Sequence, residues 1–370
     1  MLGVGMHPFG IFPDVSPLEM GRVAAEAALA DAGLSFAAID AVYVGFIGAI
    51  RMGAPKMVKE LGLTGVPVVR VEAASATGAA AFREACLAVA GGHYERVLVV
   101  GFDKMEEMPA RFGTGSTEAT LLPAAFFAMW AERRRHERGT TPRTLAWIAA
   151  KNWNQAAHNP YAHRRPDHVV TEDEVLAARM IATPLTSMMA APVGGGAAAA
   201  VVGPVAGARR SGGRPVVRVL AAELRSETYT PGHVFLGPIV GPSRMTADAA
   251  RAAYERAGVG PEDVDVVAVH DAFAIEELEY YELLGFAREG EGDRLVAEQA
   301  TRIGGAIPFS TDGGLIGRGH PGGPTGLAQI AELTWQLRGE AGPRQVADAR
   351  VGLAHLVGAG SVCTVHILAR

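Results

Sequence analysis

The feature that most constrains the fold is an internal repeat at an offset of 225 residues. An alanine-rich helical segment ends at Gly33, and Asp40 follows seven residues later. The same unit recurs at Gly258 and Asp265. Each aspartate directly precedes a short hydrophobic strand. A repeat of this length predicts two related α/β halves that pack together.

We therefore predict an N-terminal half over residues 1–210 and a C-terminal half over residues 211–370. Residues 103–190 have a different character, since they hold three of the four tryptophans and a run of arginines. We predict that they form a mostly helical insertion in the first half, which covers a site. Its helices are expected at 122–138, 142–158 and 172–181.

Composition excludes several classes of function. The 370 residues are 49% hydrophobic, which is ample for a packed core, and the net charge of −5 does not favour nucleic acid or an anionic membrane. Two cysteines are too few for a disulfide framework or a thiolate metal site. The N-terminus lacks a signal-peptide pattern, and no apolar run is long enough to span a membrane. We expect a cytoplasmic protein.

Ser75 lies at a predicted strand–turn–helix elbow. A β-branched run at 68–71 leads into small residues, and an amphipathic helical pattern then continues to about residue 90. The first N–H groups of a helix have no intrahelical partner, so an anion formed at its start is stabilised. Two interpretations remain open at this point. The elbow holds a nucleophile, or its small residues only allow a buried helix to pack tightly.

Two histidines occupy positions that favour chemistry. His270 follows a buried strand, and the carboxyl ends of strands are where open α/β sheets bind ligands. His320 lies in the glycine-rich turn 319–326, which leads into a helix. His320 thus stands in the second half roughly where Ser75 stands in the first. Either histidine alone is compatible with a structural role, but the pair at one predicted site indicates function.

Taken together, these motifs resemble the thiolase superfamily, in particular the sterol carrier protein-type and archaeal acetyl-CoA acetyltransferase-like thiolases. The resemblance extends over nearly the whole chain. It implies the thiolase fold, in which two duplicated halves form α-β-α-β-α layers. The stretches that carry it are 71–78, 269–273, 285–290, 310–314, 319–326 and 352–355.

The resemblance also implies roles for the site residues. Ser75 stands where working thiolases carry the cysteine that attacks an acyl thioester. His320 corresponds to the histidine that helps to form the thiolate and polarises a thioester oxygen, and His270 to one that contributes to an oxyanion hole. Coenzyme A would enter as an acyl thioester substrate, with no covalently bound cofactor and no metal in this chain.

Three positions depart from the family pattern. A cysteine thiol has a pKa near 8.5, whereas the serine hydroxyl of Ser75 is far more basic and needs a strong base beside it. The proton-transferring residue of the C-terminal loop is replaced by Leu356. Gly195 replaces the acid of a Ser-Asp-Gly motif. Cys86 and Cys363 lie in hydrophobic patterns and are expected to be core residues.

Three functions are compatible with these departures. The chain is an acyltransferase that makes or breaks a C–C bond in acyl-CoA thioesters with Ser75 as an altered nucleophile. Alternatively, it is a retro-aldolase that cleaves a β-hydroxyacyl-CoA without a covalent intermediate, or a non-catalytic thiolase-fold subunit that binds acyl groups or a partner. The sequence also leaves open a serine introduced to trap a complex.

The resemblance further implies partners. Thiolase-fold chains form homodimers, and sterol carrier-type relatives work with a small OB-fold, zinc-ribbon protein that would itself hold the zinc. No nucleic acid and no membrane span are expected. The arginines and histidines of 130–165 are candidates to bind the phosphates of coenzyme A, although a solvated helix face is the simpler explanation for them.

Overall fold

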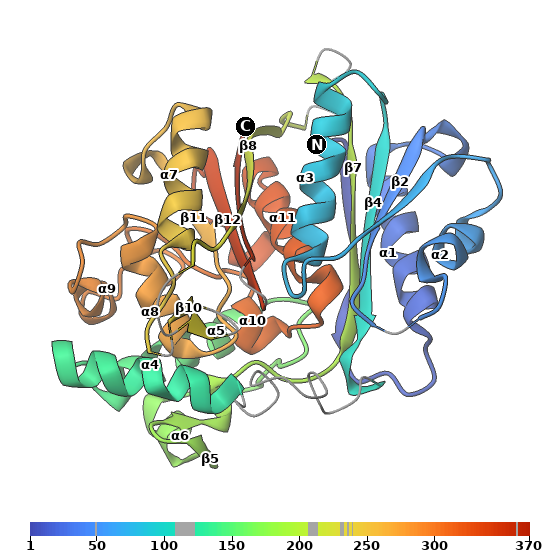
Figure 1. The fold of residues 1–370 in the computed structure, drawn as a ribbon. Helices are drawn as coiled ribbons and strands as arrows, with labels where there is room; N and C mark the ends of the chain where they lie inside the picture. The colour runs from blue at the N-terminus through green and yellow to red at the C-terminus, as the bar shows by residue number, and fades with distance from the viewer. Residues whose placement is uncertain are drawn as a thin grey trace.

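The structure is a computed structural model, in which two β-sheets stand side by side with helices between and outside them (Figure 1). Helices α3 (Thr77–Ala90) and α11 (Gly322–Arg338) form the central layer. The predicted thiolase-type layering is therefore confirmed. The residues described are 1–48, 50–107, 123–205, 214–229, 233–234, 237–238, 240–359 and 362–370.

The first half is built on a five-stranded sheet with the order β1-β7-β4-β2-β3. Strand β2 runs parallel to β3 and β4, whereas β7 runs antiparallel to β1 and β4. Helices α1 (Pro17–Ala32) and α2 (Gly53–Leu61) cover its outer face. The strands are β1 (Gly3–Gly10), β2 (Ala41–Gly45), β3 (Val68–Val71), β4 (Val97–Lys104) and β7 (Gly195–Val202).

The second half repeats this arrangement with the strand order β11-β12-β13-β8. A single parallel bridge from Val267 to Phe309 stands where the first half has β3. The strands are β8 (Arg218–Ser226), β11 (Val266–Ala268), β12 (Val351–Gly358) and β13 (Val362–Ala369). The helices are α7 (Met245–Ala257), α8 (Ala274–Leu283), α9 (Gly292–Ala297) and α10 (Gly314–Arg318), and a small hairpin joins β9 (His233–Val234) and β10 (Gly237–Pro238).

The repeat seen in the sequence is a repeat of backbone geometry. Gly33 and Gly258 end α1 and α7 with left-handed φ angles of 66° and 68°, which glycine adopts without strain. Asp40 accepts the backbone N–H groups that lead into β4, and Asp265 accepts those that lead into β12. In each half the aspartate thus ties the start of one parallel strand to its neighbour.

The predicted insertion gathers at one end of the layered body (Figure 1). Helices α4 (Pro123–Arg138) and α5 (Pro142–Ala156) agree with the prediction. The helix expected at 172–181 is wrong in its length, because α6 (Glu172–Ala177) ends early and the hairpin β5 (Met180–Ala182) and β6 (Leu185–Thr186) follows. The predicted division at 210/211 lies outside the described residues. The 3-10 turns are Phe36–Ala38, Met105–Glu107, Ser187–Met189, Pro261–Asp263 and Gly342–Arg344.

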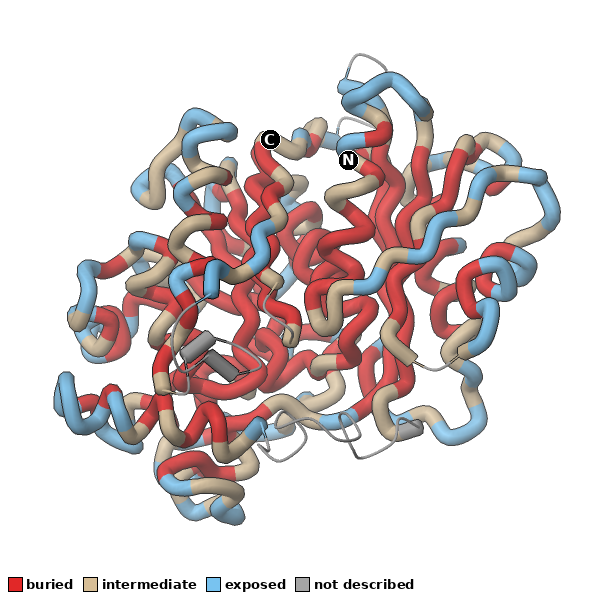
Figure 2. The backbone as a smooth tube through the Cα atoms, in the orientation of Figure 1, coloured by how far each residue is buried: buried red, intermediate tan, exposed pale blue. Residues whose placement is uncertain are grey.

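The insertion belongs to the first half in sequence but packs against the second. Residues of α4 and α5 share one hydrophobic core with α7, α8 and strands β12 and β13. A second core lies between the two sheets around α3 and α11, and a third lies under α1 and α2. Figure 2 shows the central layer as mostly buried, with α11 enclosed along nearly its whole length and α3 along its N-terminal half. The insertion therefore fastens the two halves together.

Glycines bring the two central helices into backbone contact at their N-termini. A Cβ added to Gly78 of α3 would lie 2.2 Å from the carbonyl oxygen of Gly323, and one added to Gly326 of α11 would lie 2.6 Å from the Cβ of Ala79. No larger residue fits at either position without moving a helix. This close approach places the two elbows next to each other.

Among the described residues, no helix is both long enough and apolar enough to cross a membrane.

Candidate active site

Ser75 and His320 meet where the two central helices begin. Each residue lies two positions before the first residue of its helix, Thr77 in α3 and Gly322 in α11. The Ser75 Oγ is 3.2 Å from His320 Nε2. Ala74 adopts a left-handed φ of 47°, an uncommon conformation for alanine that turns the chain sharply before the serine. The predicted convergence of the two elbows is thus present in the structure.

The hydrogen-bond network assigns the tautomer of His320. Its Nδ1 lies 3.0 Å from the Thr325 hydroxyl oxygen, and that hydroxyl donates its own hydrogen to the Pro321 carbonyl. The Thr325 oxygen must therefore accept from Nδ1–H. The lone pair of His320 is then on Nε2, and the Ser75 hydroxyl donates to it. Ser75, His320 and Thr325 are thus arranged as a nucleophile, a base and a group that orients the base would be.

The surroundings of His320 keep its imidazole neutral. Burial lowers the pKa of His320 well below its usual value, and the neighbouring His270 and Arg318 lower it further. Because the neutral ring is the form with a free lone pair, His320 Nε2 is able to accept a hydrogen bond from the Ser75 hydroxyl at neutral pH.

His270 lies beside this pair, after the carboxyl end of β11. Its ring meets the His320 ring edge-on, with 5.0 Å between the ring centroids. Its Nδ1 is 2.8 Å from the carboxylate of Glu276, in the first turn of α8. The three residues selected from the sequence, Ser75, His270 and His320, therefore lie in one cluster.

A buried polar network fixes the loop that carries His270. The Asp271 carboxylate accepts the Leu315 backbone N–H at 2.7 Å and the Asn152 side-chain amide at 2.7 Å. Asn152 also donates to Glu277, which forms a buried ion pair with Lys151. Burial, and the nearby Glu277 carboxylate, raise the pKa of Asp271 well above its usual value. Helix α5 of the insertion thus supports the site from behind.

Asp103, at the end of β4, holds the loop before α2 against the start of α11. Its carboxylate accepts backbone N–H groups from Ile47, Gly48 and Gly323, at 2.8 Å for Gly48 and 2.6 Å for Gly323. Burial raises the pKa of Asp103 to about 6, against the effect of these three donors. An anion at this point also complements the dipole of α11. Asp103 therefore helps to set the position of the His320 loop.

The residues that depart from the family pattern supply no further acid or base. Leu356 is fully buried in β12, and Gly195 forms a backbone pair with Lys104 in the first sheet. Burial raises the pKa of both Cys86 and Cys363 to about 12, so neither thiol is a ready nucleophile. The expectation of a core position agrees with the structure for Cys363, which is fully buried, whereas Cys86 is partly buried at the edge of a core.

Most of the arginines considered for phosphate binding have structural partners. Arg134 is buried and bonds to Glu282 and Asp293, and the Arg164 guanidinium donates to two backbone carbonyls above the Trp153 ring. Arg133, Arg135, Arg138 and Arg143 each pair with an acidic side chain at the surface. Among the histidines of the insertion, His163 lies beside Gly319, at the start of the His320 loop.

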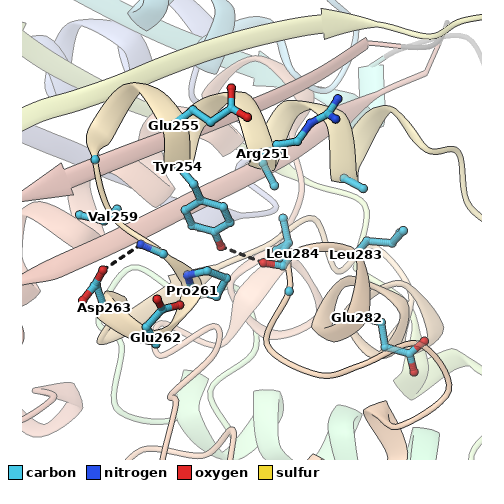
Figure 3. Close-up of a pocket in the computed structure, with 15 residues that line it drawn as sticks. Arg251, Tyr254, Glu255, Val259, Pro261, Glu262, Asp263, Glu282, Leu283 and Leu284 are labelled. Atoms are coloured by element: carbon cyan, nitrogen blue, oxygen red, sulfur yellow. Dashed lines mark hydrogen bonds between the residues drawn. The ribbon is translucent and has the colours of Figure 1, made fainter.

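A surface pocket of about 680 Å³ lies elsewhere, between the end of α7 and the end of α8 (Figure 3). The Tyr254 hydroxyl crosses it to donate to the Leu284 carbonyl at 2.8 Å. None of Ser75, His270 and His320 lines it. Its charged lining is mostly acidic and would repel phosphates: Arg251, Glu255, Glu262, Asp263 and Glu282.

Sequence reasoning missed three residues that shape the site. Thr325 lies within the glycine-rich motif already singled out, five residues after His320. Glu276 occupies the third position of α8, where an acid commonly caps a helix, and its carboxylate accepts the Phe273 N–H. Asp103 gave no local signal, because its partners are 55 or more residues away in the sequence.

Two duplicated halves with paired elbows, a serine on one and a histidine on the other, define the class of five-layered α/β proteins with a site between the halves. The chain belongs to the thiolase family. The model of the thiolase N-terminal domain matches residues 3–204, and the thiolase C-terminal domain-like model matches residues 240–370.

Several relatives match the chain over most of its length. It is 37% identical to an acetyl-CoA acetyltransferase of Methanothermobacter thermautotrophicus, with 100% of this chain and 99% of the relative covered. It is 34% identical to sterol carrier protein 2 of Homo sapiens, covering 99% of this chain and 71% of the relative. It is 33% identical to the benzoylsuccinyl-CoA thiolase subunit BbsB of Thauera aromatica, covering 97% of this chain and 94% of the relative.

Solved structures share the fold. The aldolase Ltp2-ChsH2(DUF35) superposes with a TM-score of 0.84 at 24% identity, over 100% of this chain and 96% of that chain. The Acat5 thiolase from Ascaris suum in complex with coenzyme A superposes with a TM-score of 0.73 at 16% identity, over 100% of this chain and 98% of that chain.

Proposed function

We propose that this protein acts on acyl-CoA thioesters and makes or breaks a C–C bond by Claisen-type acyl transfer, with Ser75 as the nucleophile. The observation that carries the proposal is the 3.2 Å contact between Ser75 Oγ and the lone pair of His320 Nε2. A serine hydroxyl attacks a thioester only if a base takes its proton. His320 is such a base, held in one tautomer by Thr325.

The remaining steps use groups around this contact. As Ser75 attacks, its proton passes to His320 Nε2, and the negative charge of the tetrahedral intermediate develops near the N-terminus of α3. The proton on His320 then goes to the departing thiolate of coenzyme A. The acyl group remains as an ester on Ser75 until an enolate attacks it.

Acylation of Ser75 is directly measurable. After incubation with an acyl-CoA, intact-protein mass spectrometry is expected to show one added acyl group on the wild type and none on Ser75→Ala. His320→Ala should slow acylation by about 100- to 10,000-fold, the usual contribution of a positioned base. Ser35→Ala, which removes a serine beyond the site, serves as the matched control. No adduct on the wild type would remove Ser75 as a nucleophile.

A second candidate is retro-aldol cleavage of a β-hydroxyacyl-CoA. The presence of Ser75 at the thiol position and of Leu356 in the C-terminal loop favours it, because this cleavage needs a stabilised thioester enolate and no covalent intermediate. Turnover of a β-hydroxyacyl-CoA by a wild type that forms no acyl adduct would select this reaction.

A third candidate is a non-catalytic subunit that binds acyl groups or a partner. The name of the Thauera aromatica relative describes a thiolase subunit, which is compatible with such a role. If Ser75→Cys gains thiolysis that the wild type lacks, the pocket is retained but the wild type is not a thiolase. That result would favour the subunit over the acyltransferase.

We expect a homodimer in the cytoplasm, joined along β3. This strand is an edge of the five-stranded sheet, and Val69 on it is 40% exposed. Unpaired strand edges are readily covered by a second chain. Light scattering after gel filtration should give twice the mass of one chain. Co-purification with a small OB-fold, zinc-ribbon protein would establish the second expected partner.

A further inference from the structure

A buried carboxylate stands directly behind His270. The Glu276 side chain is fully enclosed, and three donors converge on it. They are His270 Nδ1 at 2.8 Å, the Phe273 backbone N–H at 2.9 Å and the Tyr280 hydroxyl at 3.2 Å. An ionised carboxylate accepts all three. His270 Nδ1 therefore carries a hydrogen, and the lone pair of the ring lies on Nε2. Within the described part of the chain, Nε2 makes no hydrogen bond.

The two histidines of the site thus have different support. His320 is backed by the neutral hydroxyl of Thr325, and burial, with His270 and Arg318 nearby, lowers the pKa of His320. His270 is backed by the Glu276 carboxylate, which accepts the Nδ1 hydrogen and so fixes the lone pair on Nε2. Of the two rings, His270 is the one whose Nε2 has no hydrogen-bond partner among the described residues.

The site also needs a proton carrier that the C-terminal loop does not provide. Gly358 of β12 lies against the Ser75 elbow, since an added Cβ would be 2.2 Å from the Ala73 carbonyl oxygen. Leu356 is two residues earlier on the same strand and so faces the same side. The strand therefore reaches the elbow, but the leucine offers only hydrocarbon there.

We propose that the Glu276–His270 pair is the base that removes the α-proton of the acyl-CoA substrate. The inference rests on the proposed C–C bond chemistry and names the residue that performs its proton transfer. His270 is the catalytic residue, and Glu276 is a positioning residue that acts through it.

The step balances in protons and electrons. His270 Nε2 takes the proton from the α-carbon, and the electron pair of that C–H bond becomes the enolate, with its charge on the thioester oxygen. The enolate pair then forms the new C–C bond to the acyl carbon on Ser75. The C–O bond to Ser75 breaks, and the proton from His270 returns to the Ser75 oxygen.

Exchange of the α-protons tests this step alone. With acetyl-CoA in D₂O and no second acyl donor, the wild type should incorporate deuterium, followed by NMR. Glu276→Gln keeps the shape of the side chain but removes its charge, and is expected to slow exchange about 100-fold or more. Glu279→Gln removes a carboxylate that lies on the same helix but pairs with Arg134, and should exchange like the wild type.

Further measurements distinguish loss of the base from misfolding of a variant, and failure of this inference from failure of the acyl-serine proposal. Nitrogen-15 NMR of the wild type should show His270 with its hydrogen on Nδ1, and His270→Asn should lose exchange even if Glu276→Gln fails to fold. Exchange without acylation of Ser75 would support the base and remove the acyl-serine. Undiminished exchange in Glu276→Gln, or no exchange by the wild type, would overturn the inference.

Discussion

The two halves of this protein share a backbone plan but carry different chemistry at the same point. In the first half, β3 leads within a few residues to the Ser75 elbow. In the second half, the corresponding strand is reduced to the bridge at Phe309, and α10 intervenes before the His320 elbow. The duplicated part supplies two facing helix N-termini, and the divergent part supplies a hydroxyl on one and an imidazole on the other.

Each half also reaches into the central helix of the other. Asp103 of the first sheet accepts the Gly323 N–H at the start of α11. His366 of the second sheet lies with its Nε2 3.1 Å from the Ala79 carbonyl near the start of α3. The comparison teaches that a site between duplicated halves is fixed by contacts that are not themselves duplicated.

The largest effect is expected from separating the two elbows. In Gly78→Ala the new Cβ would meet the Gly323 carbonyl oxygen at 2.2 Å, so one helix must move. We expect the free energy of unfolding to fall by about 3 kcal/mol or more, with loss of acyl transfer. Urea denaturation measures the first and turnover the second.

The control for this variant is Gly139→Ala, whose position has a φ of 76° but no atom within 4 Å of a new Cβ. It should lose only about 1 kcal/mol, from backbone strain. Equal losses in both variants would contradict the close contact between α3 and α11.

A pH-dependent effect is expected from Asp103. Burial raises its pKa to about 6 in the folded protein, above the usual 3.8. The folded state therefore binds this proton more tightly than the unfolded state, and the stability that it contributes is present below pH 4 and lost as the pH rises through 6. The loss is on the order of 3 kcal/mol.

Asp103→Asn removes this titration, so the unfolding free energy of the variant should change less between pH 4.5 and 7 than that of the wild type. Urea denaturation at several pH values gives the difference between the two curves. If the curves run parallel, Asp103 does not titrate in this range.

The reciprocal contact at His366 should act in the opposite direction. Burial lowers the pKa of His366 to about 4, below its usual 6.5. The unfolded state therefore binds the proton more tightly, and stability present above pH 6.5 is lost as the pH falls toward 4. By pH 5 the loss reaches about 2 kcal/mol.

His366→Gln can still donate to Ala79 but does not titrate. Thermal unfolding at pH 5 and pH 7.5 should therefore show a smaller acid shift in the variant than in the wild type. A shift of the same size in both proteins would place the acid sensitivity elsewhere.

The smallest effects are expected at the duplicated aspartates, where the halves are most alike. Asp40→Ala and Asp265→Ala each remove an acceptor for two backbone N–H groups at a partly exposed strand start. We expect losses of about 1 kcal/mol that are similar in the two variants. Clearly unequal losses in urea denaturation would show that the two aspartates stabilise their halves to different extents, although they make the same contacts.

The sequence by itself determined the duplication, the two elbows and the departures at Ser75 and Leu356. These features depend on local patterns, such as a glycine after a helix or small residues after a strand. Such patterns can be recognised in a single sequence because they involve residues close together in the chain. The length of α6 was misjudged for the same reason, because the helical pattern continues past Ala177 whereas the backbone becomes extended at Ala178 and enters the β5–β6 hairpin.

Only the tertiary structure decided which groups support the site. Asp103 meets Gly323 across the two halves, Asn152 reaches Asp271 from the insertion, and Glu276 turns toward His270 instead of acting only as a helix cap. The first two contacts join elements that are more than 100 residues apart, so no local pattern predicts them. The partners of the two histidines are only five and six residues away, but the direction of each side chain, and so the choice of a carboxylate for one ring and a hydroxyl for the other, is decided by the folded backbone.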